Sequence, residues 1–228
     1  MSIITSNTFN FLKNLKKNNN REWFNENKKA YQTSHEEMIE LGEELLKGLQ
    51  GFDEIETLSG KKSLFRIYRD VRFSKNKAPY KTNRSGSFRR AGADRRGGYY
   101  FSIEPGNSLI GGGFYGPSSE DLKHLRNQID ADAEPLRTVL NQKQFKSYYG
   151  NLQGETLKTA PRGFEVDNPN IDLLRFKNFY VIHQFSDQEV MADDFPKKVL
   201  EGFKIIQPFF EAMTLYLTTD LNGESILD

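Results

Sequence analysis

A basic and aromatic segment, FRIYRDVRFSKNKAPYKTN at positions 65–83, holds the side chains best suited to binding an anion. Residues alternate between apolar and polar over 64–72, which predicts a strand with one core-facing side. We expect the core side to carry Phe65, Ile67 and Val71. The other side is then predicted to carry Arg66, Tyr68, Asp70 and Arg72.

These polar side chains have complementary chemistry. An arginine guanidinium offers a planar fork of donors that fits a carboxylate or a phosphate. Asp70 is close enough in sequence to orient one such fork, and Pro79 stiffens the loop that presents Tyr80 and Lys81. The segment therefore predicts a cradle for a phosphate- or carboxylate-bearing small molecule. The competing interpretation is an Arg–Asp–Tyr network that only pins a loop onto the sheet.

The predicted ligand-binding residues of this segment are Arg66, Tyr68, Arg69, Arg72, Lys77 and Lys81. If the protein is an enzyme, we expect Asp70 or Tyr80 to transfer a proton, whereas the arginines and Lys81 stabilise developing negative charge. Whether a reaction occurs is left open by the sequence.

Charge is distributed very unevenly along the chain. Residues 61–100 hold 13 Lys and Arg but only two acidic residues, although the whole chain has a net charge of +1. A localised excess of this size attracts anions. The alternative is that the acidic helices fold over the basic segment and neutralise it.

A run of glycines, GGGFYG at 111–116, formally matches the GxGxxG pattern. A dinucleotide site needs the helix to begin within the glycines, but Pro117 follows the run here. Gly112 and Gly113 are therefore expected in a strand that something approaches closely, either a ligand or an aromatic ring such as Tyr99 or Tyr115. Arg162, in the turn after Pro161, is a further candidate for the anion cradle.

No metal site is predicted. The three histidines stand far apart, none lies in a zinc-binding pattern, and the chain has no cysteine. The sequence names no cofactor.

The order of the predicted elements indicates an α+β fold. Helical periodicity covers about 1–50, strands dominate about 63–116, and helices with one late strand fill about 118–219. We expect a central antiparallel sheet of four to five strands, with helices on one face and at the ends. Strands are predicted at 64–72, 87–90, 99–104, 108–115 and 179–185, and Pro208 is expected to kink or split the last helix. The whole chain, 1–228, is expected to be one globular domain.

Composition limits the class of protein. A chain of 228 residues can bury a core without disulfides, and its aromatic content of 13% argues against disorder. No run reaches the roughly 18 to 20 apolar residues that a membrane helix needs. The N-terminus shows no basic segment followed by an apolar run, so a cytoplasmic protein without membrane partners is expected.

The basic segment also resembles a known family. FRIYRDVRFSKNKAPYKTN and the following GYYFSIEPGNSLIGGG, together with FLKNLKKNNNREWFNENKKAY and LKTAPRGFE, are similar to a widespread bacterial and fungal family, number twenty-four sixty-one among the domains of unknown function. The resemblance spans nearly the whole chain and implies a shared fold, but no activity and no catalytic residue. The matching residues are Arg66, Arg69, Asp70, Arg72, Phe73, Lys77, Pro79, Tyr80, Lys81, Gly112, Gly113, Arg162 and Gly163.

Three functions are consistent with these observations. The first is binding of an anionic small molecule by the cradle. The second is a nucleic-acid-binding module that uses the basic 61–100 stretch, with affinity that falls steeply with salt. The third is a protein-interaction or structural domain whose charge asymmetry serves head-to-tail contacts. The sequence does not specify an oligomeric state.

Overall fold

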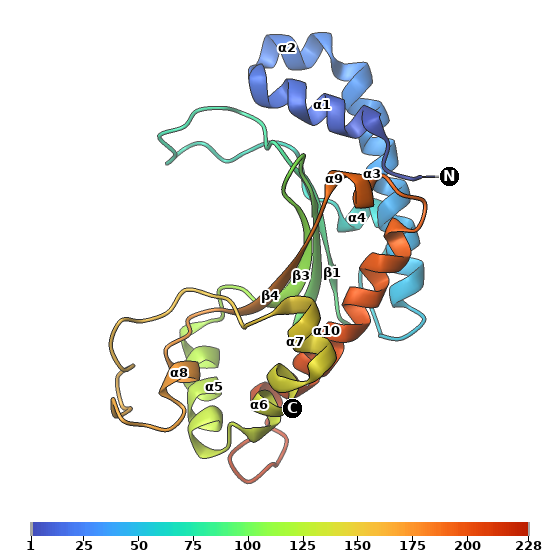
Figure 1. The fold of residues 1–228 in the computed structure, drawn as a ribbon. Helices are drawn as coiled ribbons and strands as arrows, with labels where there is room; N and C mark the ends of the chain where they lie inside the picture. The colour runs from blue at the N-terminus through green and yellow to red at the C-terminus, as the bar shows by residue number, and fades with distance from the viewer. Residues whose placement is uncertain (1, 228) are drawn as a thin grey trace. The chain divides into compact units, whose positions relative to one another are not determined.

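The computed structural model describes residues 2–227 and confirms the predicted α+β class (Figure 1). Over these residues the strands form one antiparallel sheet in the order β1-β2-β3-β4. The strands are β1 (Arg84–Arg89), β2 (Gly98–Ile103), β3 (Ser108–Phe114) and β4 (Phe179–Phe185). Four of the five predicted strands are confirmed to within three residues. The turn between β2 and β3 places Gly106 at a φ of 76°, which suits glycine.

The chain divides into two compact units. The first unit contains the residues up to Phe88, Tyr100–Ile110 and Gln184–Glu201. The second unit contains Arg89–Tyr99, Gly111–His183 and the residues from Gly202 onward. The single domain expected from the sequence stays a prediction, and each unit is described by itself below.

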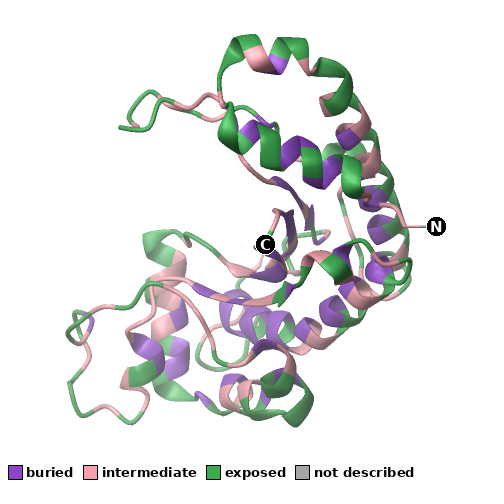
Figure 2. Ribbon diagram, turned by 45° about the horizontal axis from the view of Figure 1, so that its top comes forward, coloured by how far each residue is buried: buried purple, intermediate pink, exposed green. Residues whose placement is uncertain are grey.

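The first unit begins with three helices, and polar side chains cap the N-termini of the first two. Its helices are α1 (Ser6–Lys17), α2 (Arg21–Glu26), α3 (Lys28–Leu49), α4 (Gly60–Ser63) and α9 (Asp187–Val190). Asn20 caps the N-terminus of α2, because its side-chain oxygen accepts a hydrogen bond from the backbone amide of Trp23. The stripe of Met38, Leu41 and Leu45 in α3 is fully buried, as its helical spacing predicts. Figure 2 colours the ribbon by burial, with buried residues in purple.

A small aromatic core joins α1, α2 and α3 to the basic segment. Phe11, Leu12, Leu15 and Phe24 pack with Ile67 and Tyr80, and the last two come from the segment predicted to bind ligand. The ring of Tyr80 stacks on Phe24 with centroids 4.1 Å apart. Asparagine at position 19 pairs with both backbone groups of Tyr80, donating to its carbonyl and accepting from its amide at 3.0 Å.

The predicted strand over 64–72 is wrong. This stretch is one arm of an irregular hairpin, and within residues 2–227 its strand-type pairing with the other arm is limited to the isolated bridges Leu64–Gly86 and Tyr68–Tyr80. Ile67 is buried as expected, but Phe65 is 44% exposed. The backbone groups of Phe65, Arg69 and Lys81 pair across the hairpin, yet the register shifts between the two bridges, so no continuous ladder forms. We call residues 64–86 the basic hairpin.

Helix α4 lies so close to α3 that only glycine fits between them. A Cβ on Gly60 would meet the backbone nitrogen of Glu43 at 2.2 Å, and a Cβ on Gly42 would meet the Gly60 carbonyl oxygen at 2.9 Å. This contact fixes the start of the basic hairpin, because Leu64 follows α4 directly.

The second unit packs aromatic rings against the last helix. Its helices are α5 (Ser119–Ala131), α6 (Glu134–Asn141), α7 (Lys143–Tyr149), α8 (Ile171–Leu174) and the larger part of α10 (Phe195–Thr218). Tyr99 of β2 contacts Phe203 and Phe210 with ring centroids 4.9 and 5.0 Å apart. Helix α10 continues through Pro208, so the chain is not split there, and the kink that the sequence also allows stays a prediction. The packing of the buried Phe209 and Phe210 outweighs the proline penalty of about 3 kcal/mol.

None of the helices between residues 2 and 227 is long and apolar enough to cross a membrane.

Candidate functional site

Arg84, the first residue of β1, is a buried cation with no counter-ion in contact among residues 2–227. Only 2% of the residue is exposed, and its Nε and Nη1 atoms are buried without a hydrogen-bond partner among the described residues. Its remaining nitrogen, Nη2, lies 2.8 Å from Nδ1 of His35, and the guanidinium sits over the Tyr31 ring at 5.2 Å. A buried charge that lacks a counter-charge is costly to a folded protein, so this arginine calls for a specific explanation.

Other cations of the same unit act on the same groups as Arg84. The charges of Arg66 and Arg84 help to lower the pKa of Lys81, although burial is the larger cause. Lys61 of α4 and Arg84 both act on His35. We call Lys61, Arg66, Lys81 and Arg84 the cationic cluster.

Exposure within the cationic cluster changes in steps. Arg66 is exposed, Lys81 is half-buried with its Nζ 5.4 Å from the Phe65 ring, and Arg84 is buried. Arg66 forms no hydrogen bond or ion pair with residues 2–227. The cluster thus presents positive charge from the surface to the interior, and low-dielectric surroundings strengthen the attraction of the buried charge for an anion.

Burial and nearby positive charge both favour the neutral form of His35 by lowering its pKa. An arginine only donates hydrogen bonds, so Nδ1 of His35 accepts and its proton lies on Nε2. Burial lowers the pKa of His35 below the usual 6.5, and the charges of Arg84 and Lys61 lower it further, against a small opposing effect of Glu36.

Stability is expected to fall as pH drops below 6.5 in a way that depends on His35. The unfolded chain binds the proton more readily than the folded protein in this window, so acidification favours unfolding. His35→Gln keeps an acceptor for Arg84 and should flatten the wild-type dependence between pH 6.5 and 5. Urea unfolding of both proteins across that range measures the difference, and parallel curves would contradict the assignment.

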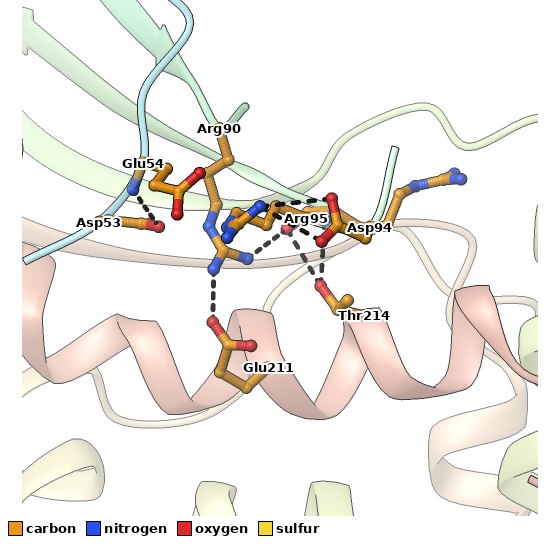
Figure 3. A network of polar contacts seen from close by, with 8 residues as sticks. Asp53, Glu54, Arg90, Asp94, Arg95, Glu211 and Thr214 are labelled. Atoms are coloured by element: carbon orange, nitrogen blue, oxygen red, sulfur yellow. Dashed lines mark hydrogen bonds and ion pairs between the residues drawn. The ribbon is translucent and has the colours of Figure 1, made fainter. Parts of the chain in front are cut away.

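A second buried arginine shows what full compensation looks like. Arg90 is 3% exposed, yet its Nη2 forms an ion pair with Glu211 of α10 and its Nη1 donates to the Arg96 carbonyl at 3.0 Å (Figure 3). Its guanidinium also lies 5.5 Å from the Phe210 ring. Arg90 therefore has a structural explanation, and the same explanation is missing for Arg84.

Several residues predicted to bind ligand make contacts inside the basic hairpin instead. Arg72 forms an exposed ion pair with Asp70, with Nη2 and Oδ2 2.6 Å apart, and this contact lowers the pKa of Asp70. Arg69 donates to the Ala78 carbonyl at 2.9 Å, and Lys77 donates to the Val71 carbonyl at 3.0 Å. These contacts match the loop-pinning interpretation left open by the sequence.

The two residues expected to transfer a proton lie in different environments. Asp70 is exposed in the basic hairpin, whereas Tyr80 is buried against Phe24. Burial raises the pKa of Tyr80, which keeps its hydroxyl neutral. The arrangement supplies no acid–base pair from these two side chains. Tyr68 is 54% exposed, and its ring lies 5.4 Å from that of Tyr80.

The remaining predicted residues, Gly112, Gly113 and Arg162, belong to the second unit. A Cβ on Gly112 would lie 2.6 Å from the Phe210 ring, and one on Gly113 would lie 2.2 Å from the Phe179 carbonyl oxygen. An aromatic ring and strand β4 thus occupy the space that the missing side chains leave. Arg162 is exposed in the loop after Pro161.

Sequence reasoning selected Arg66 and Lys81 but missed Arg84 and His35. Arg84 lies in a polar stretch, NRSGS, that has no apolar alternation to indicate burial. His35 is 49 residues away from Arg84 in the chain, and only the fold brings them together. The available signal was the unbalanced charge of 61–100.

Comparison with known proteins identifies relatives at the level of a family. No curated protein and no solved structure gives a significant match. A family model described as "Conserved hypothetical protein" matches residues 7–211 and confirms the resemblance seen in the basic segment. The chain therefore belongs to the conserved hypothetical protein family DUF2461.

Proposed function

We propose that the protein binds a small molecule with a phosphate or carboxylate group at the cationic cluster. The observation that carries this proposal is Arg84, a buried guanidinium with two nitrogens that have no hydrogen-bond partner in the described part of the chain. A bound anion would supply the missing charge and accept hydrogen bonds from these donors.

The surroundings of Arg84 support an external partner. Its hydrogen-bond contact is a neutral histidine and its ring contact is Tyr31, so no described side chain in contact with it carries negative charge. Lys81 and Arg66 lie nearer the surface, where an arriving anion meets them first. Anion binding there would reduce the electrostatic repulsion among Arg66, Lys81 and Arg84. It would also supply hydrogen-bond acceptors for the two nitrogens of Arg84.

Calorimetric titration with inorganic phosphate, sulfate and succinate at constant ionic strength tests the proposal. We expect at least one anion to bind wild-type protein, and Arg84→Met to weaken that binding at least about tenfold. A lost hydrogen bond to a charged group costs about 1.5 to 3 kcal/mol. Arg72→Met is the matched control, because Arg72 is exposed and paired with Asp70.

Two results would overturn the assignment. Equal binding by wild type and Arg84→Met would show that the anion lies elsewhere, and loss of binding only in Arg72→Met would place it at the exposed ion pair. Absence of binding by all three anions would remove the proposal itself.

A further inference from the structure

Two exposed aromatic rings flank the cationic cluster. Phe65 is 44% exposed and Tyr68 is 54% exposed, and Arg66 lies between them in the sequence. Lys81, a member of the cluster, has its Nζ 5.4 Å from the Phe65 ring. Large aromatic side chains bury 150 to 250 Å² each when covered, so each of these exposed rings has the capacity to take up a planar apolar group.

Both rings are held in place from behind. Tyr68 packs against Phe24 and Tyr80 with centroids 6.4 and 5.4 Å apart, and Phe65 packs against Tyr100 at 6.4 Å. The buried ring of Tyr80 stacks in turn on Phe24. Supported rings of this kind lose little conformational entropy when a flat ligand stacks on them.

We infer that the anion bound by the cationic cluster carries an aromatic base, as in a nucleotide, and that Tyr68 and Phe65 stack on that base. The inference rests on the proposed function and adds the ligand class. Arg66, Lys81 and Arg84 hold the phosphate, whereas the rings recognise the base through its π-face. Stacking of this kind tolerates any base, so no base preference follows from it.

Two ligands would supply this chemistry. One is a free mononucleotide, and the other is a nucleotide within a single-stranded nucleic acid. Phe73, at 96% exposed, stands on the same hairpin next to Arg72, whose guanidinium is 5.9 Å from its ring. A strand would be long enough to use this second aromatic and cationic pair, whereas a mononucleotide would not.

Calorimetric titration with adenosine 5′-monophosphate and ribose 5-phosphate tests the inference, because the two probes differ only in the base. We expect the base to strengthen binding at least about fivefold. Tyr68→Ala should remove that gain and leave the affinity for ribose 5-phosphate unchanged, while Tyr68→Phe should keep it. Phe65→Ala is a second test, for the case in which loss of Tyr68 disturbs the packing on Phe24.

Failure of this inference and failure of the proposed function give different results. Equal affinity for the two probes, or equal weakening of both by Tyr68→Ala, would overturn the nucleotide assignment while anion binding stands. If neither probe nor any inorganic anion binds, both proposals fall.

A six-nucleotide single-stranded DNA distinguishes the two sources. Tighter binding than the mononucleotide, weakened by Phe73→Ala, would identify a strand as the ligand and support base stacking. Binding no tighter than the mononucleotide, with Phe73→Ala unchanged, would support the free nucleotide.

Discussion

Arg84→Met and Arg90→Met are expected to change stability in opposite directions, although both remove a buried arginine. In anion-free buffer Arg84→Met should unfold with a free energy between the wild-type value and about 2 kcal/mol above it, because an uncompensated buried charge is replaced by an apolar side chain. The lost contact with His35 offsets part of this gain.

Arg90→Met should instead lower the free energy of unfolding by about 2 kcal/mol, because it breaks an ion pair and the hydrogen bond to Arg96. Breaking a fully buried ion pair costs roughly 3 to 5 kcal/mol of stability. The loss in Arg90→Met should be smaller, because Glu211 is half exposed and can be hydrated.

Urea unfolding with and without a saturating anion measures both effects. At about 100 times its dissociation constant, an anion should add about 2.7 kcal/mol to the wild type and to Arg90→Met, and at most about 1.4 kcal/mol to Arg84→Met, whose affinity is at least about tenfold lower. Lower stability of anion-free Arg84→Met than of the wild type would mean that the guanidinium stabilises the fold, which contradicts its role as a binding group.

Gly60→Ala is expected to be among the most damaging single-methyl changes in the first unit. The new Cβ would lie 2.2 Å from the Glu43 nitrogen and 2.8 Å from the Ile39 carbonyl oxygen, and both are backbone atoms that cannot rotate away. Separating α3 and α4 should cost about 3 kcal/mol, at the upper end of overpacking effects. Because α4 carries Lys61 and leads into the basic hairpin, anion binding should weaken as well.

Gly51→Ala is the control for this change. Its Cβ would meet the Gly48 carbonyl oxygen at 3.2 Å, a tight contact at the end of α3 where the chain can adjust. Thermal unfolding of the two variants should show a much larger decrease in melting temperature for Gly60→Ala, and similar decreases would argue against a close α3–α4 contact.

The elements with a strong local signal were predictable. The stripe of Met38, Leu41 and Leu45, the hairpin around Gly106, and the β-rich run of β4 each carry periodicity or turn residues that fix their structure. Residues 64–72 show the same alternation, but packing against other parts of the fold prevents a regular strand there. Tyr80 and Ile67 pack onto the helices and leave Phe65 exposed.

The candidate site was predictable only in part. The excess charge indicated the right segment, and Arg66, Tyr68 and Lys81 remain in the proposals. Asp70 forms an ion pair with Arg72, two positions away. The same pattern of an aspartate near arginines is also typical of a ligand site, so the sequence alone cannot tell the two roles apart. Arg84 contacts His35 of α3, which is far away in the chain. Neither secondary-structure propensity nor an alternation of apolar and polar residues predicts a contact of this kind.

The pair of hydrogen bonds between Asn19 and Tyr80 bears on the order in which parts of the chain fold. It joins residues 61 positions apart, whereas α1, α2 and α3 close over short loops. Contacts of large sequence separation carry a higher loop-closure cost and form later. We therefore expect the basic hairpin to dock onto helices that have already formed, and its amides to exchange with solvent before those of α3. The part of the chain proposed to meet a ligand is then also the part that opens first.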